Sequence, residues 1–81
     1  MKASIKFLGM QRVITNTDSL DMPINGNTKV KDALEHVRRQ YPDLTLQDGM
    51  VLITVNYEVA GADRLLKDGD SISFLPLIAG G

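Results

Sequence analysis

The sequence predicts an α+β domain in which a mixed sheet of four to five strands wraps around one main helix. Short stretches of alternating or β-branched apolar residues flank a single segment of helical periodicity, which gives the order β-β-α-β-(short β)-β. One helix cannot cover both faces of a sheet, so the sheet is expected to curl around it as a roll. The 81 residues suffice for one small domain that folds alone.

The first two strands are expected to form a hairpin. Apolar and polar residues alternate from residue 2 to residue 7, which predicts a strand with one buried face, and Leu8 then falls on the polar face. The second strand is predicted over Ser19–Ile24. Pro23 indicates that this strand lies at an edge of the sheet, because proline has no N–H to donate to a neighbour. Between the two strands, residues 12–14 either extend the first strand or form a loop.

The main helix is predicted to begin at Val30 and to end before Pro42. Apolar residues recur along this segment at i, i+3, i+4, i+7 and i+11, namely Val30, Ala33, Leu34, Val37 and Tyr41. Thr28 is expected to cap the first turn with its hydroxyl, and the proline ends the helix. His36, the only histidine, falls on the polar face and is expected to be a solvated surface residue.

Three further stretches are expected to complete the sheet. Val51–Val55 is a β-branched run, Asn56 suits a tight turn, and Tyr57–Ala60 forms a short strand. The last strand is predicted over Ser71–Leu75, after a turn at Lys67–Asp70. The Asp-Gly-Asp in this turn lacks the further carboxylates of a calcium loop, so its expected role is structural.

Composition excludes several classes of function. The chain has no cysteine, which rules out disulfides, thiolate metal sites and a cysteine nucleophile. Its formal net charge of -1 gives no reason to expect nucleic acid or an anionic membrane as a partner. The apolar runs are far shorter than the ~20 residues of a membrane span, and no secretory signal is evident. A soluble cytoplasmic protein without a bound metal is therefore expected, and no catalytic constellation is found.

The end of the chain is unusual. Residues 76–81 are expected to form a flexible tail outside a domain that spans residues 1–75, with Pro76 ending the pairing of the last strand. Gly80 and Gly81 have no Cβ, so they can pass through a gap that other residues would block. Six extended residues at ~3.3 Å each span about 20 Å. The tail can therefore present the carboxylate of Gly81 to the active site of another protein.

Two leucines lie on unexpected faces of their strands. Leu8 is on the polar face of the first strand, and Leu75 is opposite Ile72 and Phe74 on the last one. If these strands are neighbours, the two leucines form one exposed patch beside the tail, joined by Val59, and such a patch is typical of a protein interface. The alternative is a set of scattered surface residues, which is common.

Several motifs follow one another along the whole chain. They are the strand 2–8, the helix opening Val30–Leu34, the helix end Tyr41-Pro42, Val55-Asn56, the turn Leu66–Asp70, and Phe74-Leu75-Pro76 running into Ala79-Gly80-Gly81. Together they resemble the MoaD/ThiS family of ubiquitin-like sulfur carriers. Leu-x-Asp-Gly-Asp combined with a terminal Ala-Gly-Gly is the specific feature. Length and the proline in the tail favour the branch of the small subunit of molybdopterin synthase, although Leu77 stands where that branch often has a second proline.

The resemblance implies a β-grasp fold and activation of the C-terminus. An E1-like enzyme would use ATP to adenylate Gly81, and a persulfide from a partner would convert it into a thiocarboxylate. The chain would then be a substrate or subunit of enzymes, with no cofactor of its own. The tail would enter the large subunit of molybdopterin synthase. The resemblance places the partner-binding surface at Leu8, Arg12, Val59 and Leu75 and along the tail at Pro76, Leu77, Ile78 and Ala79.

Two other functions remain open at this stage. The first is a ubiquitin-like modifier that is joined through Gly81 to lysines of other proteins. The second is a β-grasp binding module without transfer chemistry, which would keep its function if Gly81 were deleted. For a sulfur carrier, the acceptor pathway also stays open among molybdopterin, thiamine, tRNA and amino-acid biosynthesis.

Overall fold

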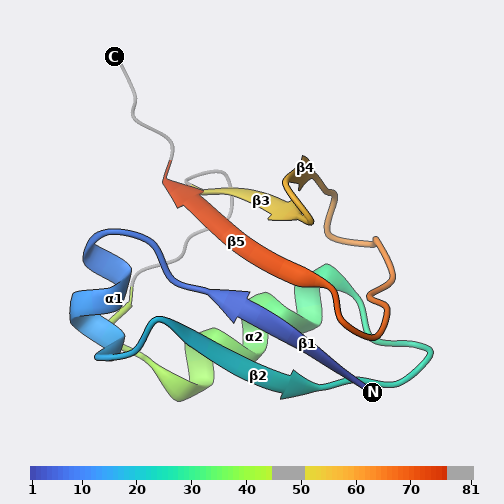
Figure 1. Ribbon diagram of the computed structural model, residues 1–81, viewed down its shortest axis with the longest axis horizontal. Coiled ribbons are helices and arrows are strands. Elements are labelled where there is room, and N and C mark those ends of the chain that lie inside the picture. Colours follow the sequence, from blue (N-terminus) through green and yellow to red (C-terminus); the bar gives the residue numbers. More distant parts are fainter. Residues whose placement is uncertain (45–50, 77–81) are drawn as a thin grey trace.

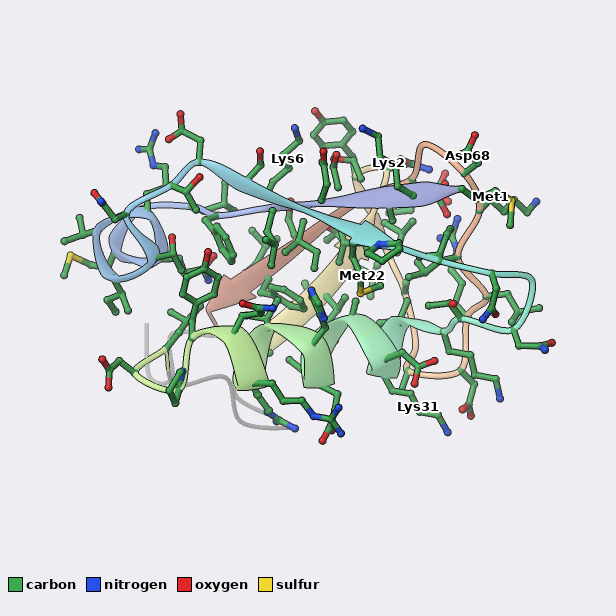
Figure 2. All side chains as sticks on the ribbon, turned by 90° about the horizontal axis from the view of Figure 1, so that it is seen from below. Met1, Lys2, Lys6, Met22, Lys31 and Asp68 are labelled. Carbon is green, nitrogen blue, oxygen red and sulfur yellow. The ribbon has the colours of Figure 1, made fainter. Side chains whose placement is uncertain are left out.

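A computed structural model describes residues 1–44 and 51–76, and these residues form one mixed sheet with a main helix against one face (Figures 1 and 2). The elements in chain order are β1 Lys2–Lys6, α1 Met10–Thr15, β2 Ser19–Pro23, α2 Val30–Gln40, β3 Val51–Val55, β4 Glu58–Val59 and β5 Ser71–Pro76. The five strands lie in the order β2-β1-β5-β3-β4. The pair β1/β5 is parallel and the other pairs are antiparallel. The predicted α+β roll is confirmed.

The hairpin of β1 and β2 forms as predicted. Its register pairs Ala3 with Met22 and Ile5 with Leu20, so the apolar residues of both strands face the helix. β2 lies at the edge of the sheet, which confirms what Pro23 indicated.

The core lies between the sheet and α2. Its largest fully buried side chains come from β1, α2, β3 and β5, and they are Ile5, Val30, Val37, Val55, Ile72 and Phe74. Burying one such side chain contributes about 1.5–3 kcal/mol. The predicted stripe of α2 faces this core, and Tyr41 at the end of the helix makes an edge-to-face contact with Phe7, with ring centroids 5.6 Å apart. The strands β1 and β5 are therefore packed against α2 through their inward side chains.

The connection between β1 and β2 contains the helix α1, so the expectation of an extended strand or a loop was wrong. Residues with positive φ bound this helix, Gly9 at 50° before it and Asn16 at 58° after it. Both are residue types that tolerate the left-handed region. The buried side chains of α1 are polar, Gln11 and Thr15. The apolar residues of this helix also have helical spacing, but in six residues the pattern covers little more than one turn, which is too short to identify a helix.

The cap of α2 also differs from the expectation. The N-cap residue is Lys29, whose N–H donates to Asp32 Oδ2 at 2.8 Å. Thr28 is not the cap because its hydroxyl is engaged in the preceding turn, where it accepts from the N–H of Asn25 at 3.0 Å. A lysine side chain cannot accept a hydrogen bond, so the carboxylate of Asp32, favourable in the first turn of a helix, stabilises this end.

The Asp-Gly-Asp turn is structural, as predicted. Asp70 is buried, and its two carboxylate oxygens accept hydrogen bonds from Asn56 Nδ2 at 2.9 Å and from the N–H of Lys67 at 2.8 Å. Asn56 Oδ1 in turn accepts from the N–H of Ser71 at 3.0 Å. Gly69 adopts a φ of 84°. The turn thus ties the start of β5 to the end of β3.

Candidate functional site

The candidate site surrounds the end of β5, from which the C-terminal segment continues. Pairing with β3 extends to Pro76, one residue further than expected, opposite Val51. The predicted tail residues Leu77, Ile78, Ala79, Gly80 and Gly81 lie outside the described residues. The surface at the base of that segment is therefore what the structure shows of the site.

Two different elements hold the end of β5. On one side β3 pairs with it, placing Leu52 opposite Leu75. On the other side, β1 pairs with β5 only as far as Ser73. After Ser73, the side chain of Gln11 in α1 replaces β1 as the partner of the strand. Its Nε2 donates to the carbonyl of Phe74 at 2.7 Å, and its Oε1 accepts from the N–H of Leu8 at 3.0 Å. The buried amide of Gln11 thus clamps α1 to the last strand.

The sequence alone did not identify Gln11 as part of this site. Its acceptor is a main-chain carbonyl 63 residues away. Every residue has such a carbonyl, so the sequence does not show which one a side chain will bind. The only available indication is the pair Gln11 and Thr15, spaced i, i+4 as on one face of a helix.

The residues of the predicted patch, Leu8, Leu75 and Val59, lie at separate places on the outer face of the sheet. Leu75 is half-buried, and its cross-strand neighbour is Leu52, a residue that the sequence reasoning did not include. Val59 is exposed on the short edge strand β4 and pairs with Thr54 of β3. In the register, Thr54 lies two residues along β3 from Leu52, so Val59 is displaced from the base of the tail.

Leu8 and Arg12 share a depression of about 280 Å³ on the same side of the sheet. Leu8 is partly exposed, and Arg12 Nη1 lies 4.0 Å from Asp18 Oδ1 in an exposed ion pair. The described residues that line this depression are Lys6, Phe7, Leu8, Arg12, Asp18, Tyr57, Ser71 and Ser73. The structure thus brings Leu8 and Arg12 together, and it places Leu75 and Val59 outside this depression.

The far end of the outer face carries a small polar cluster. Asp21 accepts from the hydroxyl of Ser4 at 3.0 Å and from Lys2 Nζ at 3.4 Å. The hydrogen bond from Ser4, followed by the hydrogen bond and charge of Lys2, lowers the pKa of Asp21 below its ordinary value of 3.8. This carboxylate is exposed and supplies charge, with no feature of a reactive group.

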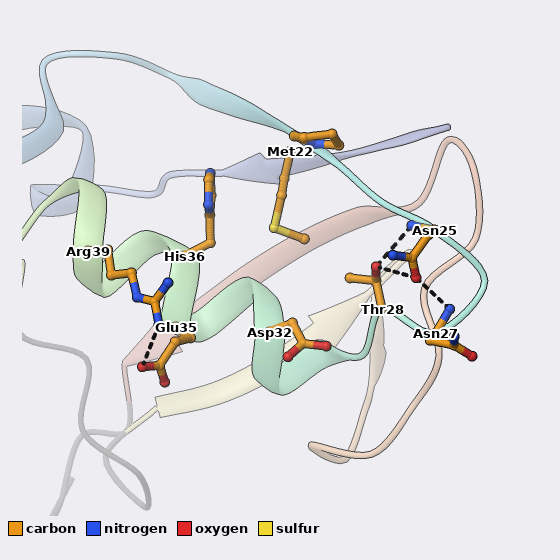
Figure 3. Close-up of a pocket in the computed structure, with 9 residues that line it drawn as sticks. Met22, Asn25, Asn27, Thr28, Asp32, Glu35, His36 and Arg39 are labelled. Atoms are coloured by element: carbon orange, nitrogen blue, oxygen red, sulfur yellow. Dashed lines mark hydrogen bonds and ion pairs between the residues drawn. The ribbon is translucent and has the colours of Figure 1, made fainter.

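A second depression, of about 430 Å³, lies between β2 and the polar face of α2 (Figure 3). His36 lines it and is half-buried, more enclosed than the solvated residue that was expected. Its charged residues already have partners: Asp32 accepts from Lys29, and Arg39 pairs with Glu35 at 3.9 Å.

Within residues 1–44 and 51–76, no three His, Asp or Glu side chains gather as a metal site needs. In the same part of the chain, no helix is long and apolar enough to cross a membrane.

Comparison with known proteins identifies relatives over almost the whole chain. The sequence matches the ThiS family over residues 5–81. It is 30% identical to the molybdopterin synthase sulfur carrier subunit of Escherichia coli, covering 95% of this chain and 96% of that protein. It is 27% identical to the protein of the same name from Mycobacterium tuberculosis, covering 100% of this chain and 99% of that protein.

Solved structures agree on the fold. The SAMP1 structure from Haloferax volcanii has a TM-score of 0.81 at 20% identity, with full coverage of both chains. The small archaeal modifier protein 1 from Methanosarcina acetivorans has a TM-score of 0.79 at 26% identity, covering 99% of this chain and 96% of that one. A complex of subunits 1 and 2 of the molybdopterin-converting factor from Helicobacter pylori contains a chain with a TM-score of 0.66 at 26% identity, with full coverage of both.

These likenesses confirm the β-grasp fold, and the family match extends through the Gly-Gly end of the sequence. The chain belongs to the ThiS family, the MoaD/ThiS group of small ubiquitin-like sulfur carriers that are not themselves enzymes.

Proposed function

We propose that the chain carries sulfur as a thiocarboxylate on Gly81 and donates it in the biosynthesis of molybdopterin. The family match over residues 5–81 is the observation that carries the first half of this proposal. The second half is supported by the two relatives named molybdopterin synthase sulfur carrier subunit, which align with this chain over nearly their whole lengths.

The geometry at the end of β5 suits a presented terminus. The strand is fixed through β3 up to Pro76 on one side and through Gln11 at Phe74 on the other. Five residues follow Pro76 in the sequence, and at ~3.3 Å each they reach at most about 17 Å. A short reach from a rigid base suits delivery of Gly81 into a buried site of a partner.

The chemistry follows from the weakness of a carboxylate as an electrophile. An E1-like enzyme lets the Gly81 carboxylate attack the α-phosphorus of ATP, which releases pyrophosphate and leaves an acyl-adenylate. A partner's persulfide sulfur then displaces AMP, and a thiol cleaves the resulting acyl disulfide to leave the thiocarboxylate. ATP is bound by the activating enzyme, so the carrier needs no cofactor of its own.

The proposed partners are the activating enzyme, a persulfide donor and the large subunit of a molybdopterin synthase. The neighbour from Helicobacter pylori, solved in complex with its second subunit, supports the last of these. The proposed contact surface combines Leu8 and Arg12, which share one depression, with Leu75 and Val59 on the outer face. Residues 76–79 of the tail complete it.

Sulfur transfer in a single turnover tests the pathway. The chain is prepared chemically with a thiocarboxylate at Gly81 and mixed with the large subunit and the molybdopterin precursor, and the sulfur content of the product is measured by mass spectrometry. Transfer that depends on the thiocarboxylate supports the proposal, and the carboxylate form is the matched control. A chain that gives no sulfur to this precursor but serves a thiazole or tRNA acceptor assigns it to another pathway.

A second function is supported by one specific observation, the likeness to the small archaeal modifier protein 1 of Methanosarcina acetivorans at 26% identity. In this role the activated Gly81 is joined to lysine side chains of other proteins. Proteolysis of cell extract would then leave Gly-Gly remnants on lysines, and these disappear when the gene is deleted. Their absence under all growth conditions would exclude conjugation.

A further inference from the structure

The short helix α1 has its polar residues buried and its apolar residues exposed, the reverse of an ordinary amphipathic helix. Its polar residues Gln11 and Thr15 face inward and are only 5% and 7% exposed. Its apolar residues Met10, Val13 and Ile14 are 69%, 69% and 44% exposed. They are spaced i, i+3, i+4, so they form one row on the helix surface, which we call the α1 stripe. The same spacing on α2 faces the core.

The α1 stripe is not part of the hydrophobic core. The inward face of α1 is already bonded: Gln11 holds Leu8 and Phe74, and Thr15 Oγ1 donates to the carbonyls of Gln11 at 2.8 Å and Thr17 at 3.1 Å. Exposed apolar side chains gathered on one element, and not scattered singly, are typical of a protein interface. The stripe therefore lacks a partner that the described residues could supply.

The position of α1 identifies the partner. Both α1 and the end of β5 lie at the same end of the molecule in the two views (Figures 1 and 2), and the Gln11–Phe74 hydrogen bond joins them directly. Because about 17 Å is the longest reach from Pro76 to Gly81, any enzyme that holds Gly81 must have its surface within this distance of the end of β5. Because α1 lies next to the end of β5, its exposed stripe is within reach of such an enzyme.

We propose that the α1 stripe docks in an apolar groove of the enzyme that activates Gly81, next to the opening through which the tail enters. This inference rests on the proposed activation of Gly81, and it adds a contact that is separate from the leucines of the outer sheet face. Gln11 acts here as a positioning residue, because it fixes the stripe relative to the point where the tail begins.

The substitution Val13→Glu tests this docking, with Leu65→Glu as the matched control. Leu65 is also an exposed apolar residue (49%), and it pairs in an isolated bridge with Lys29, the residue before α2. The segment between β4 and β5, to which it belongs, lies at the opposite end of the molecule from α1 (Figure 1). Both variants add the same charge, and glutamate is at least as good a helix former as valine. Thermal unfolding of each full-length variant confirms that it is folded; if Val13→Glu is not, Met10→Glu replaces it.

Two readouts are measured with the E1-like enzyme. One is the dissociation constant of the carrier for the enzyme without ATP, from calorimetry; the other is the KM and kcat for pyrophosphate release. Loss of a central apolar contact is expected to raise both the dissociation constant and KM by about tenfold or more, with kcat nearly unchanged because the tail still reaches the active site. Leu65→Glu is expected to match the wild type.

The possible outcomes separate this inference from the proposed function. Equal affinities for Val13→Glu and Leu65→Glu overturn the docking. If the wild-type chain binds the enzyme but releases no pyrophosphate, activation of Gly81 fails, while the affinities of the two variants still decide the docking. If the wild-type chain does not bind, both fail. A concentration-dependent dimer that Val13→Glu abolishes would show that the stripe contacts a second copy of the chain, which also overturns the inference.

Discussion

Replacing Gln11 by methionine should weaken the whole domain, because one side chain holds two main-chain groups. Methionine has nearly the same length, but its thioether is only a weak acceptor for the N–H of Leu8, now bonded at 3.0 Å, and it cannot donate to the carbonyl of Phe74, now bonded at 2.7 Å. A buried polar group left without a partner costs about 1–3 kcal/mol. We therefore expect Gln11→Met to lower the free energy of unfolding by about 2–4 kcal/mol, out of a total of roughly 4–12 kcal/mol for a domain of this size.

Thermal and urea unfolding measure this loss, and Thr15→Val is the matched control. Thr15 is equally buried on the same face of α1, but its hydroxyl donates only to carbonyls of its own segment, so its removal is expected to cost about 1 kcal/mol. The expected fall in melting temperature for Gln11→Met is roughly 10–25 °C. If the two variants unfold together, the amide of Gln11 does not clamp β5, and the description of the tail's base is wrong.

Three further substitutions test the turns and the outer face. Asp70→Ala removes a buried carboxylate and leaves its two donors, Asn56 Nδ2 and the N–H of Lys67, without an acceptor, so it should cost about 2–4 kcal/mol in urea unfolding, while Asp68→Ala, exposed in the same turn, should cost less than about 1 kcal/mol. Gly69→Ala should cost about 1–2 kcal/mol through its φ of 84° alone, since an added Cβ meets nothing within 4 Å; Gly26→Ala, equally open but without positive φ, should be neutral or slightly stabilising. Asp21 has a lowered pKa in the folded state, so its contribution is full above pH 3.8 and is lost as the pH falls through that lowered pKa. Asp21→Asn should therefore destabilise the protein at neutral pH and match the wild type in strong acid; an equal difference at every pH would refute this reading of the carboxylate.

The main elements could be predicted because their side chains repeat with a recognisable period. The alternation in β1 and the stripe of α2 follow from burial on one face, which leaves a pattern in the sequence. The edge position of β2 follows from Pro23, which has no N–H to donate to a further strand. The helix α1 was not predicted in this way, because its six residues repeat the helical spacing for little more than one turn. That its apolar row faces out and its polar residues face in could not be read from the spacing at all. The cap of α2 was missed because the hydroxyl of Thr28 bonds within its own turn.

The site was predicted in part for similar reasons. Leu8 and Leu75 stood out because they break the alternation of their strands, and the parallel pairing of β1 with β5 confirms that these strands are neighbours. Gln11 was missed because it bonds to main-chain groups, and Leu52 because only the register reveals its place opposite Leu75. The assignment of chemistry to Gly81 came from the resemblance and the family match, since glycine itself has no side chain to argue from.

The most direct test of the central claim is the state of Gly81 after activation. The full-length chain is incubated with an E1-like enzyme, ATP and a persulfide source, treated with a thiol-alkylating reagent, and analysed by fragmentation mass spectrometry. Alkylation is essential because oxidation of one of the four methionines gives nearly the same mass shift as replacing oxygen by sulfur. The predicted result is one alkylated sulfur located at Gly81, dependent on ATP and absent from a chain lacking that residue. A carboxylate that stays unmodified with every activating enzyme of the host would contradict the assignment as a sulfur carrier.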